Sequence, residues 1–159
     1  MVFRSKCLRV LGVWWILGWS ACSYALEWGR ANFNALGLQA VIESVDAREK
    51  QHASSPGIEK GKFYTLQVRL NPIGEAKTPV FDGKLELEQV AIRMPEHGHG
   101  MMGKASITPT GVQQWQVTPV KLHMDGRWEI TLDLLVTRAG VTQKHVGKMD
   151  LMLAPPTAA

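Results

Sequence analysis

The sequence predicts an all-β fold, an immunoglobulin-like antiparallel β-sandwich of about seven strands, preceded by a signal segment. Short segments in which apolar and polar residues alternate recur along the chain, and turn-forming residues separate them at intervals of about ten residues. We find no internal repeat and little sign of helix. The predicted strands are residues 37–45, 63–70, 83–93, 105–108, 115–120, 127–136 and 141–153.

The clearest strands are those with an unbroken period of two. Within residues 127–136 one face is apolar and carries Trp128, Ile130, Leu132 and Leu134. In residues 83–93 the alternation slips around Gln89, which predicts a β-bulge. Pro95 ends that strand because proline cannot donate a hydrogen bond inside a sheet.

Other segments are less regular. Residues 34–44 fit a short helix or a strand, and the alternation after Gly37 favours the strand. Residues 48–61 are polar and predict an exposed loop, and a turn is expected at Pro109-Thr110-Gly111. We therefore expect a single domain over residues 26–153 and a disordered tail at residues 154–159.

Residues 1–25 resemble a secretory signal peptide. Basic residues Arg4 to Arg9 are followed by an apolar run over residues 10–19 and by Ser23-Tyr24-Ala25, a spacing that a signal peptidase accepts. The run is shorter than the roughly 20 residues that span a membrane. We therefore expect a periplasmic or otherwise exported protein. Two alternatives stay open: an uncleaved membrane anchor over residues 8–25, and lipidation of Cys22.

Composition excludes several classes of function. Three of the 18 basic residues lie in the first 25 residues, so 15 remain against 14 acidic ones, and no basic stripe for nucleic acid remains. Both cysteines, Cys7 and Cys22, also lie in the leader, which leaves no thiol nucleophile afterwards. There is no Gly-x-Ser-x-Gly elbow and no phosphate-binding glycine loop. We expect no enzyme.

One motif could carry chemistry, a cluster of histidine and methionine residues in two segments. The first, residues 94–102, reads MPEHGHGMM, and the second is the pair that follows Leu122. If one hairpin returns the chain to the same end of the sandwich, the two segments meet, and the glycines allow the loop to bend sharply. The candidate metal ligands are Met94, His97, His99, Met101, Met102, His123 and Met124.

Thioether sulfur and neutral imidazole together suit copper, and Cu(I) more than Cu(II), whereas zinc prefers cysteine or carboxylate beside histidine. The same residues also have a structural interpretation. Met94 and Met124 fit core positions near strand ends, and His-Gly-His-Gly fits an exposed turn. The alternative function is then a non-metal interaction domain of a cell-envelope complex, with the loop as its contact surface. His52 and His145 are expected to be solvated and structural, respectively.

The paired motif, Met94-Pro95-Glu96-His97-Gly98-His99-Gly100-Met101 and then His123-Met124-Asp125-Gly126-Arg127-Trp128, resembles that of YtkA-like and FixH-like proteins. The resemblance covers about residues 62–135. It implies an immunoglobulin-like fold, export, and an association with copper handling and respiratory oxidase assembly. A partner would then be an envelope or respiratory-complex protein, and the membrane would be reached only through the N-terminal segment. The residue order of periplasmic copper chaperones is not found here.

Overall fold

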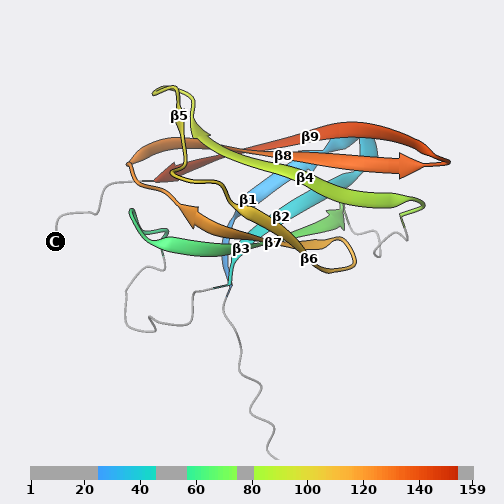
Figure 1. The fold of residues 1–159 in the computed structure, drawn as a ribbon, viewed down its shortest axis with the longest axis horizontal. Coiled ribbons are helices and arrows are strands. Elements are labelled where there is room, and N and C mark those ends of the chain that lie inside the picture. The colour runs from blue at the N-terminus through green and yellow to red at the C-terminus, as the bar shows by residue number, and fades with distance from the viewer. Residues whose placement is uncertain (1–24, 46–56, 75–80, 154–159) are drawn as a thin grey trace, which may run out of the picture.

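The chain folds into two antiparallel β-sheets that pack face to face (Figure 1). The structure is a computed structural model that describes residues 25–45, 57–74 and 81–153. The predicted signal peptide, His52 and the tail at residues 154–159 lie outside these ranges. The strands are β1 (Leu26–Phe33), β2 (Leu38–Ser44), β3 (Phe63–Pro72), β4 (Lys84–Met94), β5 (His99–Gly100), β6 (Ser106–Gly111), β7 (Gln114–Lys121), β8 (Gly126–Arg138) and β9 (Val141–Leu153).

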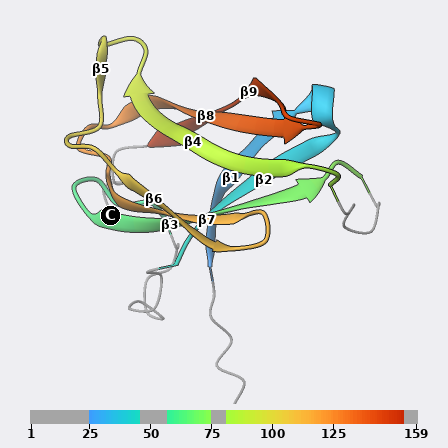
Figure 2. The same cartoon turned by 45° about the vertical axis from the view of Figure 1, so that its right-hand side comes forward.

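The strand order confirms the predicted immunoglobulin-like sandwich. One sheet has the order β1-β2-β3-β7-β6 and the other β5-β4-β8-β9 (Figure 2). Strands β2-β3-β7-β6 and β4-β8-β9 correspond to the ABED and CFG sheets of a constant-type immunoglobulin domain. Strand β1 extends the first sheet, and the two-residue β5 extends the second. In the described part of the chain no helix is long and apolar enough to cross a membrane.

The core lies between the sheets and follows the predicted alternation. Trp128, Ile130, Leu132 and Leu134 of β8 are fully buried, with 0% exposure. Opposite them, β3 and β7 contribute Leu66, Val68 and Val117. The register of β4 against β8 shifts between Leu87 and Gln89, so the predicted bulge is confirmed.

The strand expected after Gly37 is confirmed, because β2 starts at Leu38, and residues 34–36 before it form a short 3-10 helix (η1, Asn34–Leu36) that ends at Gly37 in a left-handed conformation. One local prediction needs correction. The turn expected at Pro109-Thr110-Gly111 lies further on, because β6 continues to Gly111 and the chain reverses at Val112 and Gln113. Gln113 takes the left-handed conformation there with φ of 57°.

Strands β1 and β9 pack closely against each other at one side of the sandwich. A Cβ atom placed on Gly147 of β9 would lie 2.7 Å from the ring of Phe33, which is itself 3% exposed. No real Cβ contact is that short, and the buried ring has little room to move. The contact therefore requires glycine at position 147.

We expect Gly147→Ala to lower the free energy of unfolding by about 1–3 kcal/mol, the usual cost of overpacking a core. Urea unfolding followed by circular dichroism measures the change. Gly57→Ala is the matched control, because a Cβ there meets nothing within 4 Å and the backbone φ is ordinary. Equal stability of Gly147→Ala and the wild type would contradict the close packing of β1 on β9.

The outer face of the β4-β8-β9 sheet is covered by cross-strand ion pairs. Arg93 and Lys148 both contact Glu129, and Lys144 contacts Glu88 and Asp133. The hydrogen bond from Arg93, with the nearby charge of Lys148, holds the pKa of Glu129 below its usual value. Opposite charges on neighbouring strands stabilise the register of this sheet, and they give its outer face both positive and negative side chains.

Four chain segments meet at one end of the sandwich, which we call the histidine end. They are the loop at residues 94–103, the β7–β8 connection at residues 121–126, the start of β1 and the end of β9. Pairing of Gly126 with Leu153, and of Leu26 with Ser44, places both described chain ends there. In Figure 1 the loop that carries β5 rises above this end.

Candidate functional site

The loop at residues 94–103 is a tight hairpin that presents two histidines. The backbone N–H groups of His97 and Gly98 donate to the carbonyl oxygen of Met94, at 3.3 and 3.1 Å. Gly98 has φ of 68°, a conformation that glycine adopts without strain. The N–H of Met101 then donates to the carbonyl of Ile92 at 2.9 Å, which closes the hairpin onto β4. Both imidazoles consequently project from a short, braced loop.

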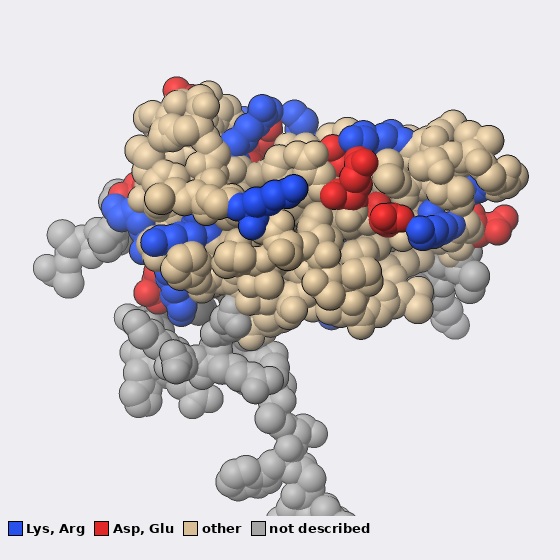
Figure 3. Space-filling view, in the orientation of Figure 1, with Lys and Arg blue, Asp and Glu red and all other residues tan. Residues whose placement is uncertain are grey.

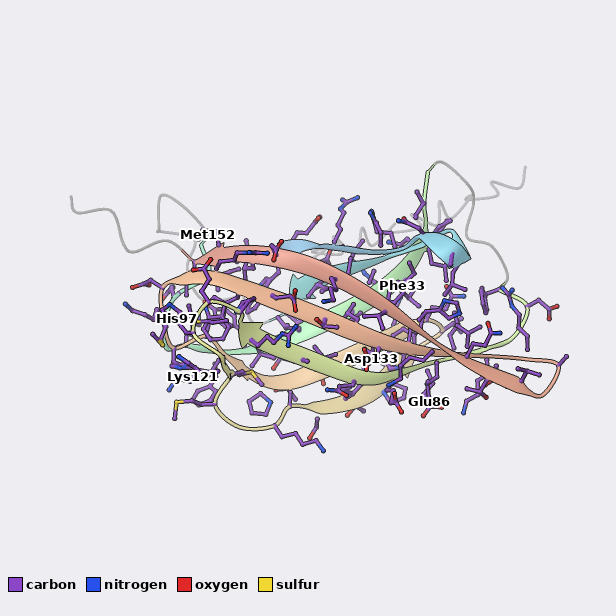
Figure 4. The ribbon with its side chains drawn as sticks, turned by 90° about the horizontal axis from the view of Figure 1, so that it is seen from above. Phe33, Glu86, His97, Lys121, Asp133 and Met152 are labelled. Atoms are coloured by element: carbon purple, nitrogen blue, oxygen red, sulfur yellow. The ribbon has the colours of Figure 1, made fainter. Side chains whose placement is uncertain are left out.

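The structure brings three of the predicted residues together. The ring centroids of His97 and His99 are 5.6 Å apart, and those of His99 and His123 are 6.0 Å apart. His123 comes from the β7–β8 connection, more than 20 residues further along the chain than His99. The expected meeting of the two segments at one end of the sandwich is therefore present. Figure 4 shows His97 at this end, with Lys121 and Met152.

These separations can be compared with the reach of a shared metal ion. An ion about 2.0 Å from an imidazole nitrogen lies about 3.2 Å from the ring centroid, so two ligating rings are at most about 6.4 Å apart. The two measured separations, 5.6 and 6.0 Å, are within this limit. Each of the pairs His97–His99 and His99–His123 is therefore close enough for its two rings to share one ion.

The nitrogen positions are a stricter test than the ring centres. Counting only histidine, cysteine and carboxylate groups, no cluster of three or more in residues 25–45, 57–74 and 81–153 is arranged to hold a metal ion. His97 and His99 are exposed, so their rings can turn. A metal centre here therefore needs these rings to turn toward His123, or a methionine sulfur to complete the set.

His123 is the most constrained of the three histidines. Its ring stands edge-on to Trp128, with centroids 5.5 Å apart and planes at 74°. The indole N–H of Trp128 donates to the carbonyl oxygen of Met124 at 3.0 Å, which fixes the backbone just after His123. The Nδ1 atom of His123 is buried and has no hydrogen-bond partner. A buried nitrogen without a partner requires an explanation, and a missing ligand is one.

The four candidate methionines differ sharply in their surroundings. Met94 is 1% exposed, and its terminal methyl packs against Gly126. Met124 is partly buried against the core. The sulfur of Met101 accepts a hydrogen bond from the backbone N–H of Lys121 at 3.4 Å, and Met102 is 67% exposed. Met101 is thus already beside the β7–β8 connection, whereas Met94 is part of the core.

A second brace holds the β7–β8 connection from the side of β3. The N–H of Gly61 donates to the carbonyl oxygen of Leu122 at 2.7 Å, and Lys60 pairs with Asp125. Nearby, the N–H of Glu59 donates to the Tyr64 hydroxyl at 2.6 Å, and burial raises the pKa of Tyr64. His123 is therefore held between two anchored residues, Leu122 and Asp125.

Other sequence candidates lie away from this cluster. His145 pairs with Leu134 in the half of β9 remote from the histidine end, in keeping with a structural role. The sequence interpretation placed Trp128 only in the core and missed its contact with His123. It also missed the Met101–Lys121 contact. The spacing from His123 to Trp128 within the motif was the available signal for the contact between these two residues.

The fold and the cluster define a class, an immunoglobulin-like β-sandwich with a histidine- and methionine-bearing end loop. Comparison of the chain with protein-family models, with curated proteins and with solved structures finds no match.

Proposed function

We propose that this chain is an exported, non-enzymatic copper-binding protein of the YtkA-like or FixH-like kind. It takes up Cu(I) through His97, His99 and His123, with a methionine thioether as a further ligand. Copper is its cargo, to be buffered or handed to an envelope or respiratory-complex protein. The leader at residues 1–25 supports export, because its basic and apolar regions have the order of a signal peptide.

One observation carries the proposal: three imidazoles from two distant segments gather at one end of the sandwich, where the ring of His99 is close enough to share an ion with that of His97 or with that of His123. Ring separations of 5.6 and 6.0 Å are close for side chains that would repel one another when protonated. The buried, unpartnered Nδ1 of His123 adds a donor that still lacks a partner.

The donor set favours copper over zinc. No cysteine lies among residues 25–159, so the soft donors at this end are thioethers. Imidazole with thioether is a set that Cu(I) accepts at low coordination number, and zinc would prefer thiolate or carboxylate. Met101 and Met102 are the sulfur candidates that the loop itself supplies. Met94 serves better as the apolar floor of the site, because it is buried.

The test is a Cu(I) titration of the purified chain against a competing chelator, with a parallel titration by Zn(II). We expect one Cu(I) per chain and weaker Zn(II) binding. His145→Ala is the matched control and should bind copper like the wild type, because His145 lies far along β9. No competition with the chelator, or tighter Zn(II) than Cu(I), would overturn the proposal.

The same titration repeated at several pH values tests histidine ligation. Imidazole binds a metal only in its neutral form, so affinity should fall as the pH drops below about 6. Thioether sulfur does not titrate in this range. Affinity that stays flat down to pH 5 would therefore exclude the histidines and leave a site of methionine alone.

A further inference from the structure

The described cations are unevenly paired. Most have a carboxylate partner, but Lys62, Lys104 and Lys121 have none within salt-bridge distance in the part of the chain that the structure describes. Arg138 is the remaining case, and it contacts the carbonyl of Asp82 and the ring of Phe81. We call the three lysines the lysine rim.

The lysine rim lies at the histidine end. Lys121 is two residues before His123, and its backbone N–H contacts the sulfur of Met101. Lys104 comes directly after the loop at residues 94–103, and it lines one groove beside β4 together with Met101. Phe63 pairs with Lys121 across the β3–β7 ladder, which places its neighbour Lys62 alongside. The rim thus flanks the candidate copper ligands.

The remaining charges at this end are largely neutralised. Asp125 pairs with Lys60, Asp150 pairs with Arg127 and Glu129 pairs with Arg93. Glu96 is the carboxylate of the loop itself and has no ion pair among the described residues. Figure 3 shows the basic side chains below the loop, whose own surface is mostly uncharged. Among the described residues of this end, the three rim lysines therefore outnumber Glu96.

Two of the rim lysines also lie over aromatic rings, of which that of Phe63 is exposed and that of Tyr64 is buried. The ammonium of Lys121 lies 4.8 Å from the ring centroid of Phe63, and that of Lys62 lies 5.5 Å from the ring of Tyr64. Phe63 is 60% exposed and Met102 is 67% exposed. Large apolar side chains in a charged rim are the usual composition of a protein contact surface.

We infer that the lysine rim receives a protein that carries copper and has carboxylates around its own copper site. This inference rests on the proposed function and names the partner class for the same site. Copper passes between two proteins only when their ligands face each other, so the surface around the histidines must touch the partner. Three uncompensated lysines favour an acidic face there, and complementary charge speeds encounter more than it strengthens binding.

The test measures how fast a chelator removes Cu(I) from the loaded chain. Bathocuproine disulfonate, which is anionic, represents an acidic acceptor, and neocuproine is its neutral counterpart. We expect the second-order rate constant for bathocuproine disulfonate, divided by that for neocuproine, to fall about tenfold in the triple variant Lys62→Gln/Lys104→Gln/Lys121→Gln. In the wild type the same ratio should fall as the salt concentration is raised.

Two further variants separate charge from structure. Lys84→Gln/Lys144→Gln/Lys148→Gln removes the same charge away from the rim and should keep the wild-type ratio. Lys62→Arg/Lys104→Arg/Lys121→Arg keeps the rim charge and should also keep the wild-type ratio of rate constants. A ratio equal in all four proteins, with Cu(I) fully bound, would overturn the inference alone. A wild type that takes up no Cu(I) in the equilibrium titration would instead overturn the proposed function.

A basic, partly apolar surface could instead bind a membrane, and binding to lipid vesicles tests this alternative. Apo chain is mixed with vesicles of phosphatidylcholine containing a quarter phosphatidylglycerol. We expect the lysine-to-glutamine rim variant and the wild type to bind them equally. Binding that depends on the rim lysines would assign the rim to lipid and overturn the inference.

Discussion

Cu(I) binding is expected to be lost when His97, His99 and His123 are replaced together by alanine. Removing every imidazole leaves only thioethers, and the dissociation constant should rise by at least about a thousandfold, equivalent to about 4 kcal/mol. Chelator competition measures the change. Because His97 and His99 are exposed and His123 is only partly buried, the triple variant should fold like the wild type, which circular dichroism can verify.

The single variants should differ in a way that the geometry predicts. His123 is oriented by Trp128 and by its anchored neighbours, so it loses little freedom on binding. We therefore expect His123→Ala to weaken binding more than His97→Ala. A triple variant that binds Cu(I) as tightly as the wild type would contradict any role of the histidines.

Trp128→Ala is expected to have the largest effect on stability. The side chain is 0% exposed at the start of the β8 core row, and a tryptophan-to-alanine change in a core costs about 3–5 kcal/mol. The variant also loses the hydrogen bond to the Met124 carbonyl, so that partly buried oxygen is left without this donor. Urea unfolding of the apo chain measures the change.

Trp128→Phe is the informative companion to that variant. It keeps an apolar ring in the core but has no N–H to donate, so it should lose less stability than Trp128→Ala. Because the β7–β8 connection is then held less firmly, copper affinity should fall even where the fold survives. A Trp128→Ala variant within 1 kcal/mol of the wild type would contradict the packing described above.

The sequence predicted the parts of the fold in which side-chain alternation is regular. Burial of every second residue from Trp128 to Leu134 follows from the period of a strand facing a core. The bulge near Gln89 was predictable because the alternation itself slips there. These features depend on neighbours in the chain, which is why a local pattern is enough to find them.

Strand β1 was missed for a related reason. Its register against β2 shifts between Glu27 and Gly29, and the shift breaks the alternation over Leu26–Phe33. The β6–β7 turn was misplaced because Val112, an apolar residue with 89% exposure, occupies the tip in place of a usual turn former. In both cases backbone geometry overrides the pattern of hydrophobicity.

The site was predictable only in part. The meeting of His97 and His99 with His123 followed from topology, since one hairpin returns the chain to the same end. The roles of the methionines did not follow, because sequence cannot tell a thioether in the core from one beside the loop. Met94 and Met101 are seven residues apart, and only tertiary packing makes one a buried residue and the other a neighbour of Lys121.

Both described ends of the chain lie at the histidine end, and this affects how the protein should be purified. An oligohistidine tag joined after residue 159 would follow Leu153 by only six residues, beside the very imidazoles to be measured. A histidine-free affinity tag, or one removed before titration, would prevent the tag from contributing copper ligands of its own.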